Sequence, residues 1–179
     1  IDFKQAIKLR KRFHENGEGL MLLEEFFTIS TVTKILFAYL YLVYRYLIVR
    51  KDIVSSRVHK NLNIDGTKIL EKLCDISFLG KNSVSGLSYY YGYKEVAKRF
   101  NSSKTLTYLM EMQAWEKAML YAFKSAAPGV HTIGYQHTSI ASNYYFYFSD
   151  PKEVGFNQSE CGIPLPKLFA VCGELQKKI

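Results

Sequence analysis

The sequence predicts an α/β domain built on a Rossmann-like parallel sheet with flanking helices. Two apolar, β-branched segments, at residues 105–110 (TLTYLM) and 131–136 (HTIGYQ), have the composition of buried strands. A helical pattern lies between them, and a third strand-like segment follows a long loop at residues 168–172 (LFAVC). Because strands that alternate with helices form parallel sheets with right-handed crossovers, we expect these three segments to pair in parallel.

The chain of 179 residues is long enough for one domain with a substantial core. It begins at Ile1, and we interpret it as an excerpt of a longer protein. Cys74, Cys161 and Cys172 have no CxxC spacing, which favours a reducing compartment and thiols that are buried or incidental. The basic start of the chain lacks the apolar core and cleavage site of a signal peptide. We therefore predict a cytoplasmic protein.

The net charge of +8 and the pI near 9.3 favour contact with an anionic partner, which could be a nucleic acid, acidic lipid headgroups or a phosphorylated substrate. The sequence has no zinc-finger spacing, RNP-like aromatic strand or basic region leading into heptads, which argues against nucleic acid. It also has no DxD pair and no HxxxH spacing. We therefore assign no metal and no cofactor.

The first sixty residues are predicted to be mostly helical. Residues 3–14 form a basic amphipathic helix that ends at His14, Asn16 and Gly17. Residues 20–27 suggest a short helix or turn. A solvated face is the simplest interpretation of the basic helix, and contact with a membrane is the alternative.

Residues 35–49 (ILFAYLYLVYRYLIV) are the most hydrophobic part of the chain. The segment is shorter than the roughly 20 residues that cross a bilayer and contains Arg45, which argues against a membrane span. It is either a buried core helix or a helix at a membrane surface, with Lys34, Arg50 and Lys51 flanking it. We favour the core helix because tyrosines spread around it leave no clear polar face.

The middle of the chain gives weaker signals. Asn63, Asp65 and Gly66 predict a turn, and residues 67–73 have a helical rhythm. Residues 81–93 combine serines, glycines and four tyrosines, and we interpret them as a loop that packs on its own domain rather than as a site.

The helix between the first two strands is predicted at residues 112–125. It is followed by Pro128 and Gly129, which end helices. Helical spacing places five apolar side chains on one face of it: Trp115, Ala118, Met119, Ala122 and Phe123.

The carboxyl ends of the predicted strands indicate where a ligand would bind. In open parallel sheets, ligands lie beyond these ends. Glu111 follows the first strand, His137 the second and Gly173 the third. We therefore expect a cleft that combines a carboxylate, an imidazole and an open backbone position.

Three sequence phrases also carry a family resemblance. They are EMQAWEKAMLYAFK, TIGYQHTSI and PLPKLFAVCGE. Together they resemble bacterial surface carbohydrate biosynthesis proteins, a glycosyltransferase-like family of GT-B architecture. The pattern is a Glu, Trp-Glu on a helix, Gly-x-Gln-His, and Pro-x-Pro before a strand that ends in Gly. The match covers about residues 105–175, and the earlier half more loosely.

The resemblance implies two Rossmann-like domains that face each other across a cleft, the first taking the acceptor and the second the nucleotide sugar. Residues 1–179 would be the acceptor-side domain, with residues 104–175 as its core β/α unit and the donor domain absent. The implied function is sugar transfer from a nucleotide sugar to a lipopolysaccharide or capsule acceptor at the inner face of the membrane. The isolated chain should then be inactive.

His137 is the first candidate for a chemical role. An imidazole with a pKa near 6.5 can take a proton from an acceptor hydroxyl or donate one to a developing phosphate charge. The alternative is a histidine that only forms a hydrogen bond at a strand end. Glu111 is the second candidate, as a base or as a ligand of acceptor hydroxyls, with favourable placement at a helix N-terminus as its alternative.

Five further residues complete the predicted site. Glu116 could orient the imidazole if it faces the cleft. Trp115 lies about 100° from it on the helix, so the two cannot share a face, and core packing is favoured over a sugar platform. Gln136, Thr138 and Gly173 would contact the substrate.

A rival interpretation is a non-catalytic binding module that recognises an anionic polymer or a membrane surface through the basic residues and tyrosines. Activity of the full-length protein separates the two.

Overall fold

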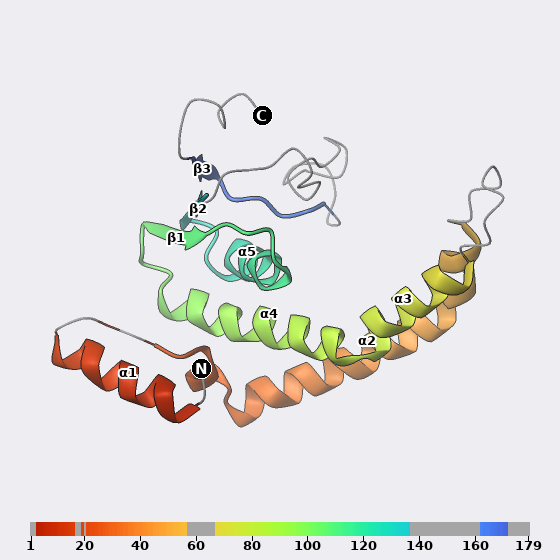
Figure 1. Ribbon diagram of the computed structural model, residues 1–179, viewed down its shortest axis with the longest axis horizontal. Coiled ribbons are helices and arrows are strands. Elements are labelled where there is room, and N and C mark those ends of the chain that lie inside the picture. The colour runs from red at the N-terminus through yellow and green to blue at the C-terminus, as the bar shows by residue number, and fades with distance from the viewer. Residues whose placement is uncertain (1–2, 17–18, 20, 57–66, 137–161, 172–179) are drawn as a thin grey trace.

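A computed structural model describes residues 3–16, 19, 21–56, 67–136 and 162–171 (Figure 1). This part of the chain is mostly helical, with a small open sheet of three parallel strands. The elements in order are α1 (Phe3–Glu15), the 3-10 helix η1 (Leu23–Phe26), α2 (Ile29–Ser56), α3 (Thr67–Leu79), α4 (Lys81–Arg99), β1 (Thr105–Leu109), α5 (Ala114–Ala126), β2 (His131–Tyr135) and β3 (Leu168–Ala170).

The strands confirm the predicted parallel pairing. Their order is β1-β2-β3, and Thr105 lies opposite His131 while Ile133 lies opposite Leu168. Each strand begins at the predicted residue and ends slightly earlier than predicted. The resulting α/β unit is compatible with a larger Rossmann-like sheet.

Helix α5 lies against one face of the sheet and helix α4 lies beyond it (Figure 1). Between them is a hydrophobic core: Ala97, Tyr108, Met110, Met119, Leu120, Phe123, Ala127 and Val130. On the other face of the sheet Leu109, Tyr135 and Leu168 are exposed. Parallel sheets are normally covered on both faces, so the described residues form only part of the usual layering.

Close packing in the sheet requires a glycine in β2. A Cβ atom on Gly134 would lie 2.9 Å from Cγ of Pro166 and 3.0 Å from Sδ of Met110. Such distances force neighbouring atoms to move. The glycine therefore lets the segment before β3 approach β2 closely.

Helix α4 corrects one prediction. The tyrosine-rich residues 81–93, interpreted as a loop, belong to a helix of 19 residues. Glycine, serine and tyrosine favour helix weakly, but tertiary packing overrides propensity. Gly92 is buried against η1, where an added Cβ would lie 3.0 Å from Cδ1 of Leu23, and the Ser83 hydroxyl donates to the carbonyl of Ser77.

Helix α2 also differs from the prediction made for it. It spans 28 residues rather than the predicted fifteen, and its segment Ile29–Ile53 is long and apolar enough to cross a membrane, a criterion of length and composition that core helices and signal sequences also meet. The preferred prediction of a buried core helix is wrong, because only 6% of the most apolar window is buried. The helix contacts α3 and α4 along one side and exposes the rest.

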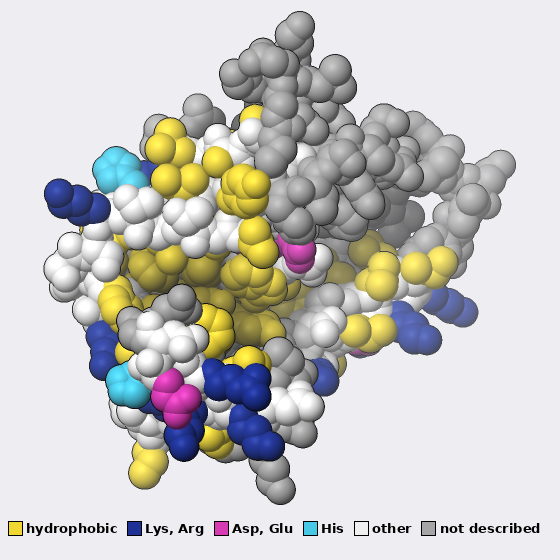
Figure 2. Space-filling model, turned by 60° about the vertical axis from the view of Figure 1, so that its left-hand side comes forward, with side chains coloured by type: hydrophobic (Ala, Val, Ile, Leu, Met, Phe, Trp, Pro, Cys, Tyr) yellow, Lys and Arg dark blue, Asp and Glu magenta, His cyan; other side chains and the backbone are white. Residues whose placement is uncertain are grey.

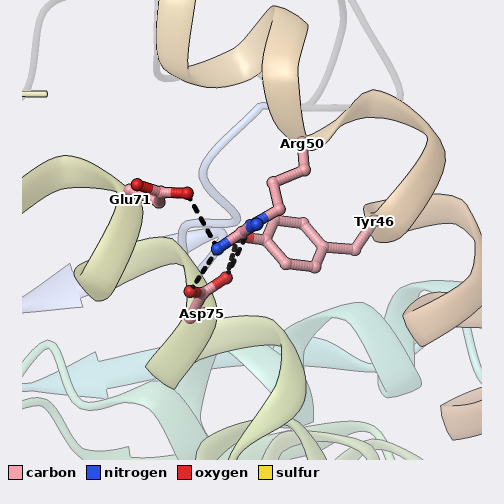
Figure 3. Close-up of polar contacts among 4 residues, drawn as sticks. All are labelled: Tyr46, Arg50, Glu71 and Asp75. Carbon is pink, nitrogen blue, oxygen red and sulfur yellow. Dashed lines mark hydrogen bonds and ion pairs between the residues drawn. The ribbon is translucent and has the colours of Figure 1, made fainter. Parts of the chain in front are cut away.

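A polar cluster joins α2 to α3 (Figure 3). The Tyr46 hydroxyl donates to Oδ1 of Asp75 at 2.6 Å, and the Arg50 guanidinium donates to both Asp75 oxygens at 3.0 and 2.7 Å. Arg50 also pairs with Glu71 at 2.9 Å. Tyr46 is buried and its ring stacks on Phe78 at 4.7 Å, so the cluster combines hydrogen bonds with aromatic packing.

The predicted basic helix at the start of the chain is confirmed as α1, and the predicted short helix or turn is η1. Arg10 of α1 pairs with Glu25 of η1 at 2.8 Å. Figure 2 shows hydrophobic side chains in the hollowed centre of one face and Lys and Arg side chains gathered below, where α1 lies. The predicted turn at Asn63, Asp65 and Gly66 lies outside the described residues.

The Asp75 cluster predicts a pH-dependent stability. Hydrogen bonds from Arg50 and then Tyr46 hold the pKa of Asp75 below its ordinary value of 3.8. A depressed folded-state pKa contributes stability above the unfolded-state pKa, and that contribution is lost as the pH falls through the folded-state value. We expect Asp75→Asn to lower the free energy of unfolding at neutral pH but not at pH values well below 3.8.

Urea unfolding at a series of pH values measures this difference. Glu24→Gln, on the exposed part of η1, is the control and should show no such pH-dependent gap. A gap that is equally large in strong acid would contradict the assigned role of Asp75.

Candidate functional site

The structure describes four of the seven predicted site residues, which are Glu111, Trp115, Glu116 and Gln136. His137, Thr138 and Gly173 lie outside the described residues. Their predicted roles stay predictions.

The carboxyl ends of the three strands meet at one edge of the sheet, as the parallel pairing requires. Hydrogen bonds continue the pairing beyond the strand ends: the N–H of Met110 donates to the carbonyl of Tyr135, and the N–H of Gln136 donates to the carbonyl of Ala170, both at 2.9 Å. Glu111 follows at this edge with its side chain exposed, whereas Gln136 is only 1% exposed. Glu111 can therefore meet a ligand, while Gln136 supports the edge from inside.

The loop from β1 to α5 is held by the buried carboxylate of Glu116. Its Oε1 accepts hydrogen bonds from the N–H groups of Glu111 at 2.9 Å and Gln113 at 3.0 Å. Its Oε2 accepts from the N–H of Met112 at 3.2 Å. Glu116 is 2% exposed, and its charge lies at the N-terminus of α5, where the helix dipole favours an anion.

Met112 shows why this loop needs such an anchor. Its φ of 59° is the left-handed region, which a long side chain rarely adopts. The Glu116 carboxylate bonds to the backbone on both sides of this residue and so stabilises the turn that presents Glu111. The sequence signal was available, because a Glu three residues after a helix-starting position is one half of a capping box.

Glu116 was predicted to orient the imidazole of His137, but its described hydrogen bonds are with the backbone of the loop between β1 and α5. Both of its oxygens are engaged with backbone N–H groups, so its described contacts act on the loop that carries Glu111. Any influence on the imidazole of His137 stays a prediction.

Trp115 packs toward the core. Its ring lies 6.4 Å from the rings of both Tyr93 and Tyr108. Burial, and secondly the charge of Glu116, raise the pKa of Tyr108, so this hydroxyl stays protonated at neutral pH. These contacts match the favoured interpretation of Trp115 as a packing residue, and its substrate-binding role stays untested.

The anchored loop also has a chemical consequence. N–H groups at this position of parallel sheets commonly bind the phosphates of nucleotides. Here three of them already bind the Glu116 carboxylate. The edge thus offers an exposed carboxylate to a ligand and little attraction to a phosphate at this loop.

Comparison of the chain with protein-family models, curated proteins and solved structures finds no match to any of them. The family resemblance therefore rests on the three sequence phrases alone.

The Glu116 anchor can be tested by substitution. Glu116→Gln keeps the shape of the side chain but replaces one acceptor oxygen with an NH₂ group that faces N–H donors. We expect the free energy of unfolding to fall by about 2–3 kcal/mol, since charged hydrogen bonds are lost in a buried site. Urea unfolding of the two proteins measures the change.

Glu95→Gln is the matched control. Its carboxylate pairs with Lys98 at 2.7 Å on the helix surface. Removing it should cost less than about 1 kcal/mol. If the free energy of unfolding falls equally in the two variants, Glu116 does not stabilise the loop more than a surface ion pair would.

Proposed function

We propose that this chain is the acceptor-side domain of a glycosyltransferase-like enzyme of GT-B architecture, which transfers a sugar from a nucleotide sugar to a lipopolysaccharide or capsule acceptor. In this proposal the three parallel strands are part of a larger Rossmann-like sheet. The observation that carries it is the parallel register, which places the carboxyl ends of β1, β2 and β3 at one edge beside Glu111.

The chemistry requires an acceptor hydroxyl to attack the anomeric carbon of the sugar while the bond to the nucleotide phosphate breaks. His137 would take the hydroxyl proton, and the nucleotide would leave with the bonding electron pair. Glu111 would hold neighbouring hydroxyls, and Thr138 and Gly173 would contact the substrate. The proposal requires the β1–β2 register to continue two residues beyond Leu109 and Tyr135, which would set His137 beside Glu111.

The loop before α5, whose N–H groups bind the Glu116 carboxylate, supports binding of the acceptor rather than of the nucleotide sugar by this domain. Domains that bind a nucleoside diphosphate commonly use free N–H groups at such a position. The Glu116 carboxylate accepts from three of them. A neutral, hydroxyl-rich acceptor is the better partner for this edge, and the donor would bind the second domain.

The test uses the full-length protein that contains this chain. Release of the nucleoside diphosphate is measured with a panel of nucleotide sugars and lipid-linked glycan acceptors. We expect His137→Ala to lower turnover by about 10²–10⁴-fold, the usual contribution of general acid–base catalysis.

His131→Ala is the control, since His131 is exposed at the opposite, amino end of β2. It should keep wild-type turnover. If His137→Ala turns over as fast as the wild type while acceptor binding is intact, the catalytic assignment is wrong. Turnover by residues 1–179 alone would overturn the assignment of the donor site to another domain.

A second candidate is a non-catalytic module that binds an anionic surface. The net charge of +8 and the exposed basic residues of α1 favour it. In that case the full-length protein would release no nucleotide with any donor, while its binding to anionic surfaces would persist.

A further inference from the structure

Helix α2 exposes an apolar face that no described element covers. Six large side chains on it are between 53% and 67% exposed: Leu36, Phe37, Leu40, Tyr44, Leu47 and Ile48. At about 100° per residue they occupy roughly a third of the helix circumference. A contiguous apolar face of this extent marks a contact with a partner or a lipid phase.

The helix is nevertheless held firmly on its other side. The Tyr39 hydroxyl donates to the carbonyl of Leu79, and Tyr46 and Arg50 bind Asp75. These contacts fix the rotation of α2, so its apolar face points away from α3. The exposure therefore follows from the way the helices pack.

Two basic residues border this face. Arg45 follows Lys34 by eleven positions, which is about three helical turns, so both lie on the same side of α2. Both are exposed, and neither forms an ion pair within the described part of the chain. They lie next to the apolar face. In a helix that lies in the plane of a membrane, basic residues at this position reach the headgroups while the apolar face contacts the acyl chains.

A groove of about 570 Å³ opens beside Lys34, between α2 and α4. It offers hydroxyl and ammonium groups together with aromatic rings: Ser30, Thr33, Lys34, Phe37, Tyr41 and Tyr91. This combination suits a phosphate headgroup whose acyl chains lie along the apolar face.

The amino-terminal region before α2 is also positively charged. Helix α1 carries Lys8, Arg10, Lys11 and Arg12, and an ion pair between Arg10 and Glu25 ties it to η1, just before α2 begins. Each basic residue near an anionic membrane surface adds electrostatic attraction, and salt weakens this attraction by screening.

We propose that α2 lies in the plane of an anionic lipid bilayer, with its exposed apolar face among the acyl chains and Lys34 and Arg45 on headgroup phosphates. An in-plane helix fits better than a span. A span would place Arg45 only four residues, or about 6 Å, from the centre of Ile29–Ile53, and would draw Glu71 and Asp75 into the hydrocarbon. The inference does not depend on the proposed sugar transfer.

Flotation of residues 1–179 with phosphatidylcholine vesicles, with and without phosphatidylglycerol, tests it. We expect binding to the anionic vesicles that weakens with salt. Leu40→Glu should reduce the partition coefficient by at least about tenfold, because burial of the leucine is lost and a charge is added. Lys34→Glu combined with Arg45→Glu should reduce the preference for phosphatidylglycerol, while the basic residues of α1 retain part of it.

Leu168→Glu is the matched control, since Leu168 is 55% exposed on the sheet and Leu40 is 53% exposed on α2. It should leave the partition coefficient unchanged. Circular dichroism and urea unfolding confirm that each variant is folded. The proposal is overturned if the wild type ignores anionic vesicles at low salt, or if Leu168→Glu weakens binding as much as Leu40→Glu.

Two further outcomes would assign the face to another occupant. If Leu40→Glu converts a dimer into a monomer without changing vesicle binding, a second copy of the chain covers the face. The orientation is tested in sealed vesicles with single cysteines at Thr28→Cys or Lys51→Cys, near the two ends of α2, in a protein whose Cys74, Cys161 and Cys172 are replaced by serine. A membrane-impermeant maleimide should label both positions, and protection of one of them would indicate a span.

Discussion

The buried carboxylate of Glu116 is the interaction on which the candidate site depends. It accepts three backbone N–H groups from the loop that joins β1 to α5 and stabilises the left-handed conformation of Met112. That turn sets the direction in which Glu111 leaves the sheet and the position at which α5 begins. Because α5 supplies much of the core beneath the sheet, the same carboxylate connects the geometry of the edge to the packing of the fold.

The described residues divide into two regions of different physical character. The sheet, α5 and α4 enclose a conventional hydrophobic core. Helices α2 and α3 instead meet through the cluster of Tyr46, Arg50 and Asp75, and leave large apolar side chains exposed. The structure thus combines a sheet edge that carries the exposed Glu111 with a helical surface of exposed apolar side chains. The proposed sugar transfer would use the first surface, and the proposed membrane contact would use the second.

Local sequence patterns predicted the elements whose composition and hydrophobic spacing match their secondary structure. The β-branched residues of β1 and β2 and the helical spacing of α5 identified these elements, and the intervening helix required parallel pairing. The edge that carries Glu111 followed from that pairing. Helix α4 was missed because its glycines, serines and tyrosines favour helix weakly, and its stability comes from contacts with α5 and η1 that no local pattern contains.

The sequence by itself determined the strand–helix–strand order, the parallel sheet and the residues that follow each strand, because hydrophobic periodicity and chain connectivity limit the possible topologies. The sequence contains half of a capping box at Glu116, but only the tertiary structure decided that this carboxylate accepts from three N–H groups of the loop and that the apolar surface of α2 is exposed rather than buried. The physical reason is that capping and burial depend on which groups lie nearby in space. Composition shows that a side chain is apolar or charged, but its partners are fixed by the backbone conformation of the nearby loop, as for Glu116, or by packing between distant segments, as for α2.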